Sequence, residues 1–193
     1  MLYGHLDGFP LSALGRVQAA AIGDSLRPAG VDRIVHSPLA RAVETAQIIN
    51  SRLDRPAVLE AEPDLREAEF SRYLQGLPYW QIPVRRPLWF VHKAKRGLLP
   101  GDESIDVMGG RVLAVVKREA TEHPDETTAV VSHADPLNAA WILLDGRPHN
   151  EREMYRRGFD KAGMLKLELD AGVPKSWVYI PPPRVEAPAG AKA

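Results

Sequence analysis

Helix-like and strand-like patterns alternate along most of the chain. In the helix-like segments, apolar residues recur at the three- and four-residue spacing that places them on one helix face. The strand-like segments are short runs rich in apolar residues. This alternation predicts an α/β fold, a three-layer sandwich with a mostly parallel sheet and helices on both faces. The predicted helices are 12–27, 38–49, 104–120 and 135–146, and the predicted strands are 31–36, 57–61, 127–133, 163–169 and 176–180.

Two predicted strand-to-helix junctions carry the same local signal. Ser37-Pro38 and Asp135-Pro136 each combine a capping residue with a proline suited to the first helical position. The amino terminus of a helix has free backbone N–H groups and the positive end of the dipole, so it favours an anion. Parallel strands bring their carboxyl ends to one edge of the sheet, where α/β proteins bind ligands. We therefore expect a site for an anion such as phosphate at these junctions.

Two segments depart from the alternation. Residues 77–100 contain three prolines before Pro100, two tryptophans and several basic residues, which indicates a cap inserted over the site. Residues 181–193 are rich in proline and alanine and offer little to bury, so we expect a disordered tail. The organisation predicted is one domain over 1–180, with its cap at 77–100 and this tail after it.

Composition and charge exclude several classes of protein. The 193 residues carry 25 basic and 25 acidic side chains, which supplies no electrostatic attraction to nucleic acid or to an anionic membrane. The longest apolar run, residues 139–144, is far shorter than the roughly 20 residues of a membrane span. The chain has no cysteine, and the residues after Met1 do not resemble a signal peptide. We expect a cytoplasmic protein that binds neither nucleic acid nor membrane.

Three residues are candidates for chemistry. Arg41 lies in the first turn of a predicted helix, where it either binds an anion or forms a surface pair with Glu44 or Asp32. His133 ends a predicted strand, so its imidazole either enters the site or is structural. Glu67 is either a proton donor or a solvated glutamate in a charged stretch. The six histidines show no metal-ligand spacing, and we expect neither a metal nor another cofactor.

The joint order of five short blocks resembles the histidine phosphatase superfamily, the phosphoglycerate-mutase-like enzymes, over residues 4 to about 170. This resemblance implies phosphoryl transfer through a phosphohistidine, with Arg41 and His133 holding the phosphate and Glu67 protonating the leaving oxygen. Ser37, Glu103 and Ser104 are expected to line the pocket. The blocks are Pro10-Leu11-Ser12-x-x-Gly15-x-x-Gln18-Ala19, Ser37-Pro38-Leu39-x-Arg41-Ala42-x-x-Thr45-Ala46, Leu65-x-Glu67, Pro100-Gly101-x-Glu103-Ser104 and Val130-Val131-Ser132-His133.

The chain departs from the family pattern at three places. Asp102 and Ala134 replace glycines that are common in the family. The family's nucleophile belongs to an Arg-His-Gly motif at the end of its first, central strand, and that motif does not occur in these residues. The resemblance thus implies a chain that, as written, starts after this strand and is inactive. His5 follows Gly4 in a loop, and we interpret it as a structural residue at the rim.

Two functions fit these observations. The first is a phosphomonoesterase acting on a small organic phosphate, which is favoured over a mutase. The second is a non-catalytic relative that binds phosphorylated ligands or partners. A serine hydrolase is disfavoured, because the chain contains no Gly-x-Ser-x-Gly.

Overall fold

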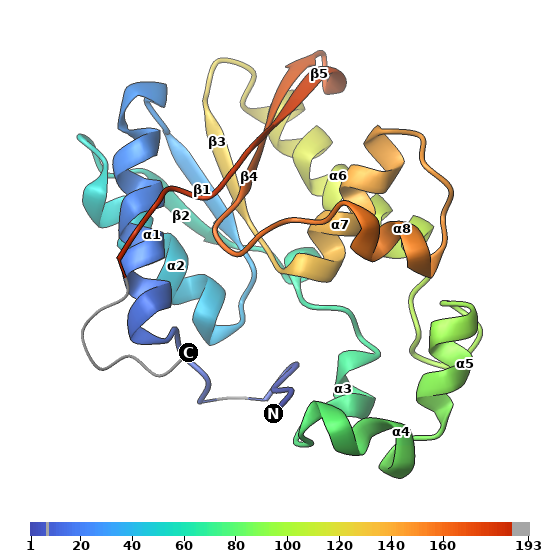
Figure 1. Ribbon diagram of the computed structural model, residues 1–193. Helices are drawn as coiled ribbons and strands as arrows, with labels where there is room; N and C mark the ends of the chain where they lie inside the picture. Colours follow the sequence, from blue (N-terminus) through green and yellow to red (C-terminus); the bar gives the residue numbers. More distant parts are fainter. Residues whose placement is uncertain (7, 187–193) are drawn as a thin grey trace.

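A computed structural model describes residues 1–6 and 8–186, and it has a three-stranded parallel sheet flanked by helices (Figure 1). The strands are β1 (Arg33–His36), β2 (Val58–Ala61) and β3 (Thr128–Val131), in the order β2-β1-β3. The long helices are α1 (Ala13–Leu26), α2 (Ala40–Arg52), α6 (Ile105–Glu122) and α7 (Ala134–Leu144). The predicted α/β fold with its parallel sheet is therefore confirmed.

Alternating side chains of the central strand β1 hold the two helical layers on opposite faces of the sheet. Ile34 packs with Ile49 of α2 in one cluster, and Val35 packs with Val112 of α6 and Ala140 of α7 in another. Ile34 and Val35 are fully buried. Full burial of such a side chain contributes about 1.5–3 kcal/mol. Consecutive residues of one strand thus fix both layers, because neighbouring strand residues point to opposite faces.

The helix starts are partly as predicted. Ser12 caps α1 by accepting a hydrogen bond from the Gly15 amide. The two capping signals at the junctions were read wrongly: α2 begins at Ala40, after Leu39, and α7 begins at Ala134, after His133. Neither helix has a side-chain cap. The residues expected to be caps have other partners, which the next subsection describes.

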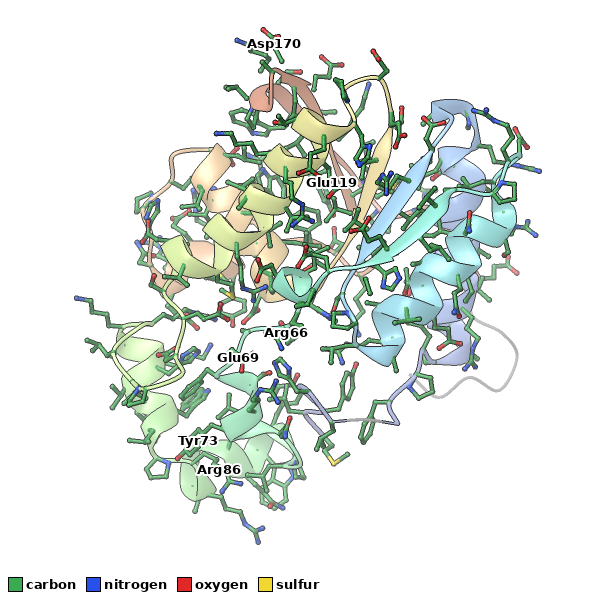
Figure 2. The ribbon with its side chains drawn as sticks, turned by 180° about the vertical axis from the view of Figure 1, so that it is seen from behind. Arg66, Glu69, Tyr73, Arg86, Glu119 and Asp170 are labelled. Atoms are coloured by element: carbon green, nitrogen blue, oxygen red, sulfur yellow. The ribbon has the colours of Figure 1, made fainter. Side chains whose placement is uncertain are left out.

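The last two predicted strands form a separate antiparallel hairpin rather than extending the parallel sheet. It consists of β4 (Met164–Asp170) and β5 (Val173–Ile180), joined by a turn in which Ala171 and Gly172 both have positive φ. Figures 1 and 2 show this hairpin on the β3 side of the sheet. Within the described residues, β3 pairs only with β1 and β4 only with β5. Within this part of the chain, one edge of β3 and one edge of β4 therefore lack a strand partner.

Short helices form a group below the sheet (Figure 1), with Tyr73 and Arg86 at its end far from Asp170 in the hairpin turn (Figure 2). Arg86 Nε donates to the Tyr73 carbonyl at 2.6 Å. The predicted cap at 77–100 contains three of these helices. The group consists of α3 (Ser71–Leu74), η3 (Tyr79–Gln81), α4 (Ile82–Arg85) and α5 (Leu88–Ala94). The short elements η1 (Arg27–Ala29), η2 (Pro63–Leu65) and α8 (Glu151–Arg156) lie elsewhere.

The chain beyond β5 is described only in part. Residues 181–186 adopt neither helix nor strand, and the rest of the predicted tail, 187–193, lies outside the described residues. Among the residues that are described, no helix has both the length and the apolar character needed to cross a membrane.

Candidate active site

The carboxyl ends of β1 and β3 meet, as the sequence predicts. His36 is in register with Val131, and the Ser37 amide donates to the Val131 carbonyl at 2.9 Å. The side chain of the same serine reaches the β3 junction: its hydroxyl lies 2.8 Å from His133 Nε2, and both residues are buried. Ser37 therefore links the two junctions and does not cap α2.

Arg41 is directed into the same region by its place in the first turn of α2. Its Nη2 lies 3.6 Å from Oε2 of Glu67, and its Nη1 donates to the Gly4 carbonyl at 3.0 Å. The side chain is only 14% exposed. The surface-pair alternative is wrong, because Glu44 pairs with Arg16 and Asp32 pairs with Arg55 instead. A guanidinium with low exposure and five donors is suited to an oxyanion.

Glu67 follows η2 and approaches the site from the cap side of the sheet. Burial, reinforced by the negative charge of Asp135, raises the pKa of its carboxyl to about 7. The Ala68 amide donates to Oε1 at 3.0 Å, and the Arg41 charge opposes the rise. The side chain is 21% exposed and lies beside Arg41, so Glu67 is not a fully solvated glutamate. A carboxyl with this pKa holds its proton close to neutral pH and is able to donate it.

His133 ends the β3 junction, and α7 starts at the next residue. Burial, followed by the positive charge of Arg41, lowers the pKa of its imidazole to about 3. The ring is therefore neutral in the free protein and offers one N–H and one lone pair. The site thus combines a fixed cation, a neutral imidazole and a carboxyl with a pKa of about 7, which can bind an oxyanion and supply a proton.

His5 is a loop residue as predicted, but it is buried, not at the rim. Its Nε2 lies 3.2 Å from the Ala68 carbonyl, and its backbone amide donates to Gln75 Oε1 at 2.9 Å. Its Nδ1 is buried and has no hydrogen-bond partner among the described residues. The positive form of His5 is one of the influences that lower the pKa of His133.

Glu103 and Ser104 bind neighbouring segments rather than the residues of the site. Within the described residues, neither forms a hydrogen bond with Arg41 or His133. Glu103 accepts from Arg111 Nε at 2.8 Å and from the Glu69 amide at 3.0 Å. Ser104 caps α6 through the Val107 amide. Arg111 was missed from the sequence, although it lies about two helical turns after Glu103 and its charge also lowers the pKa of His133.

Asp135 is the second residue that sequence reasoning assigned wrongly. It was expected to cap α7, but it lies inside the first turn and accepts from both terminal nitrogens of Arg96, at 3.2 and 3.3 Å. Within residues 1–6 and 8–186 there is no group of three or more metal-ligating side chains.

Comparison with known proteins relates this arrangement to one family. The sequence profile of the Histidine phosphatase superfamily (branch 1) matches residues 1–178. Uncharacterized protein Rv0525 of Mycobacterium tuberculosis is 33% identical over 190 residues, which cover 94% of this chain and 89% of that protein.

Two solved structures are similar to the chain. Bacillus stearothermophilus YhfR superposes with a TM-score of 0.77 at 23% identity, over 89% of this chain and 84% of YhfR, which is a likeness of fold. A mycobacterial glucosyl-3-phosphoglycerate phosphatase in complex with VO3 superposes with a TM-score of 0.70 at 28% identity, over 86% of this chain and 84% of that one.

Proposed function

Since the chain belongs to the histidine phosphatase superfamily, we propose that its site binds a small organic phosphate as a phosphomonoesterase does. The observation that carries the proposal is the meeting of Arg41, Glu67 and His133 at the joined ends of β1 and β3. The partner proposed is thus a small phosphorylated substrate. A chain without cysteine suits the cytoplasm, where we place the reaction.

The phosphate is held by groups of different charge. The Arg41 guanidinium supplies charged donors, and it exchanges the Gly4 carbonyl for a phosphate oxygen when the ester binds. His133 contributes a neutral N–H, because its pKa of about 3 leaves the ring uncharged in the free protein. Ser37 orients that ring through its hydroxyl.

Glu67 acts as the general acid. Where an Arg-His-Gly segment supplies the nucleophile, its histidine nitrogen bonds to phosphorus, the bond from phosphorus to the ester oxygen breaks, and Glu67 gives that oxygen its proton. Water then attacks the phosphohistidine, Glu67 takes up a proton from it, and inorganic phosphate leaves. A pKa of about 7 suits both transfers at neutral pH.

The nucleophile separates this function from the second candidate. The family's Arg-His-Gly motif does not occur in the 193 residues, and His5 Nδ1 is buried. We therefore propose that the chain as printed binds phosphate without turnover. The same site serves the second candidate, a non-catalytic relative that binds phosphorylated ligands or partners, and the difference lies only in the supply of a nucleophile.

Titration with inorganic phosphate tests the shared part of both functions. We expect Arg41→Gln to weaken binding by about 10- to 100-fold, because a charge-assisted hydrogen bond is lost. Arg55→Gln is the matched control, since Arg55 is exposed and pairs with Asp32. Equal affinities of the two variants in calorimetry would show that Arg41 does not hold the phosphate.

A further inference from the structure

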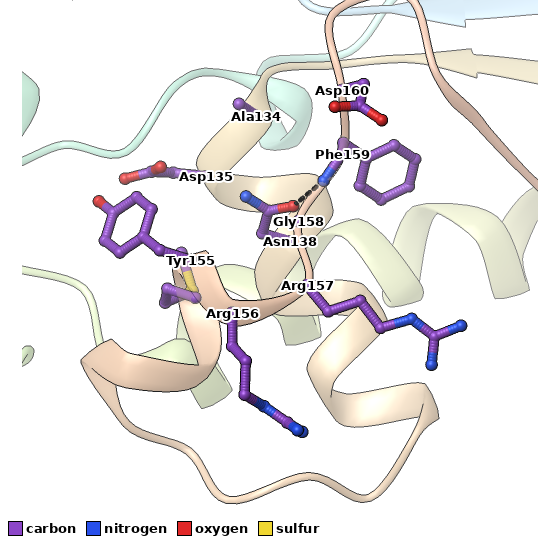
Figure 3. A pocket seen from close by; sticks show the side chains of 10 residues that line it. Ala134, Asp135, Asn138, Tyr155, Arg156, Arg157, Gly158, Phe159 and Asp160 are labelled. Atoms are coloured by element: carbon purple, nitrogen blue, oxygen red, sulfur yellow. Dashed lines mark hydrogen bonds between the residues drawn. The ribbon is translucent and has the colours of Figure 1, made fainter. Parts of the chain in front are cut away.

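A cavity of about 480 Å³ lies between α7, α8 and the chain that leads to β4 (Figure 3). Ala134 and Asp135, the two residues after His133, form its near wall. Its volume is in the range of roughly 300–1,000 Å³ that small-molecule sites have.

Asn138 gives the cavity an accessible donor on a residue that is otherwise buried. The residue is 5% exposed, and its Oδ1 accepts from the Phe159 amide at 2.7 Å. Its Nδ2 has no hydrogen-bond partner within the described chain, and Figure 3 shows this nitrogen on the side of Asp135 and Tyr155. Gly158 allows the close approach, because a Cβ there would lie 3.0 Å from Nδ2. The amide is thus fixed by one atom and free to bind with the other.

Tyr155 and Asp135 add a second donor and an acceptor. The Tyr155 hydroxyl accepts from Lys93 Nζ at 3.2 Å and from Arg96 Nη2 at 3.0 Å, so its own proton is directed to another acceptor. Burial raises its pKa, which keeps that proton in place. Asp135 accepts from Arg96 through Oδ2 only, so Oδ1 has no partner among the described residues.

The charges around the cavity restrict the ligand. Asp135 and Asp160 place carboxylates on its wall. Figure 3 shows the guanidinium ends of Arg156 and Arg157 pointing away from Asn138 and Tyr155. Arg156 pairs with Glu153 at 2.9 Å, and Arg157 lies over the Trp141 ring at 5.1 Å. A carboxylate on the ligand would therefore meet carboxylates, whereas a hydroxyl can donate to Asp135 and accept from Asn138.

We infer that this cavity binds the alcohol part of a hydroxyl-rich phosphate ester, a sugar or polyol phosphate. The inference rests on the proposed function, which supplies the neighbouring phosphate site. Hydroxyl groups both donate and accept, and this matches a wall on which Asn138 and Tyr155 donate while Asp135 and Asp160 accept. A cationic alcohol part can only donate and satisfies the acceptors alone, and an apolar one satisfies neither kind of group.

Calorimetry on the 193-residue chain tests the inference with four probes: sorbitol 6-phosphate, phenyl phosphate, phosphoethanolamine and inorganic phosphate. We expect sorbitol 6-phosphate to bind at least about tenfold more tightly than the other two esters, as one or two additional hydrogen bonds provide. Asn138→Asp keeps the acceptor for Phe159 and removes the free donors. This variant should abolish the preference for sorbitol 6-phosphate. The preference is measured as the affinity of each ester divided by that of inorganic phosphate, so that any effect of the new charge on the phosphate group cancels.

The matched control is Asn150→Asp, which introduces the same charge at the cap of α8, where aspartate serves equally well. Phenyl phosphate or phosphoethanolamine binding as tightly as sorbitol 6-phosphate would overturn the inference, and so would a preference that survives Asn138→Asp.

A second measurement separates this inference from the proposed function. Sorbitol without phosphate is added while the side-chain amide resonance of Asn138 is followed by NMR. Movement of that resonance supports the cavity as a polyol site even if inorganic phosphate fails to bind, a result that would count only against the phosphate site. No movement at saturating sorbitol, with phosphate binding intact, would refute the polyol site.

Discussion

The two strand-to-helix junctions of the site look alike in sequence but differ in surroundings. β1 has a partner on both edges, and three of its four residues are buried. β3 has a partner on one edge within the described chain, and all four of its residues are only half-buried. A short apolar run therefore specifies a strand, whereas its neighbours in the sheet decide how deeply it is buried.

The two junctions also differ in the charge of the side chains that they supply to the site. The β1 side supplies a permanent cation, Arg41, and the β3 side supplies His133, which burial keeps neutral. Glu67 lies 3.6 Å from the cation, and the pKa of its carboxyl is raised to about 7. The difference between the junctions leads to four predictions.

The largest effect should come from giving β3 a second neighbour. We expect an amino-terminal extension consisting of an apolar strand that ends in Arg-His-Gly to raise nitrophenyl phosphate turnover from undetectable to robust. The melting temperature should also rise, because paired backbone groups and covered apolar surface stabilise the sheet.

An extension ending in Arg-Ala-Gly is the control, and it should raise the melting temperature without turnover. Robust turnover by the 193 residues alone, abolished by His5→Ala, would instead identify His5 as the nucleophile.

The second effect concerns proton donation in the extended protein. Glu67→Gln should slow hydrolysis of an alkyl phosphate by about 10²- to 10⁴-fold and that of nitrophenyl phosphate much less, because only a basic leaving oxygen needs the proton. Since the pKa of Glu67 is raised to about 7, the alkyl phosphate rate should fall as pH rises through 7.

In Glu67→Gln this decline should disappear. Glu69→Gln, a change in the exposed pair with Arg72, should leave the profile unchanged. Equal slowing of both substrates by Glu67→Gln would indicate a structural role.

The third effect compares the two phosphate ligands in the unextended chain. His133→Gln should weaken inorganic phosphate binding by only about 2- to 10-fold, less than Arg41→Gln, because it removes a neutral hydrogen bond and not a charged one. Calorimetry measures both. If the histidine variant loses as much affinity as the arginine variant, the imidazole is charged in the complex.

The smallest effect is a difference in packing at one register position. Val35 of β1 and Val130 of β3 are paired neighbours in the same cluster, but Val35 is fully buried and Val130 is not. We expect Val35→Ala to lower the free energy of unfolding by about 2 kcal/mol and Val130→Ala by about 1 kcal/mol. Urea denaturation measures both, and equal losses would show that β3 is as well covered as β1.

Local patterns in the sequence were sufficient to predict the layers of the fold. Ile34 and Val35, with the helical spacing in α2 and α6, already place apolar faces on both sides of a sheet. The register of parallel strands then brought Ser37 and His133 together, as expected. The hairpin of β4 and β5 was not predicted as a hairpin, because its turn needs positive φ at Ala171 as well as at Gly172, and alanine does not signal positive φ.

The errors at the site share a physical cause. Ser37 and Asp135 were interpreted from neighbours in sequence, but their partners, His133 and Arg96, are distant along the chain. Burial of His5 and the contribution of Arg111 are likewise tertiary effects. Local capping preferences are weak, and a buried hydrogen bond or ion pair overrides them.

The open edge of β3 bears on how copies of the chain behave toward one another. An unpaired strand edge is a template on which another chain can add, and proteins often block such edges with charged residues. β4 carries Lys166 and Glu168, whereas Thr128–Val131 has no charge at all. Of the two edges, that of β3 is therefore the one prone to self-association, and the solubility of this protein should depend on what covers those four residues.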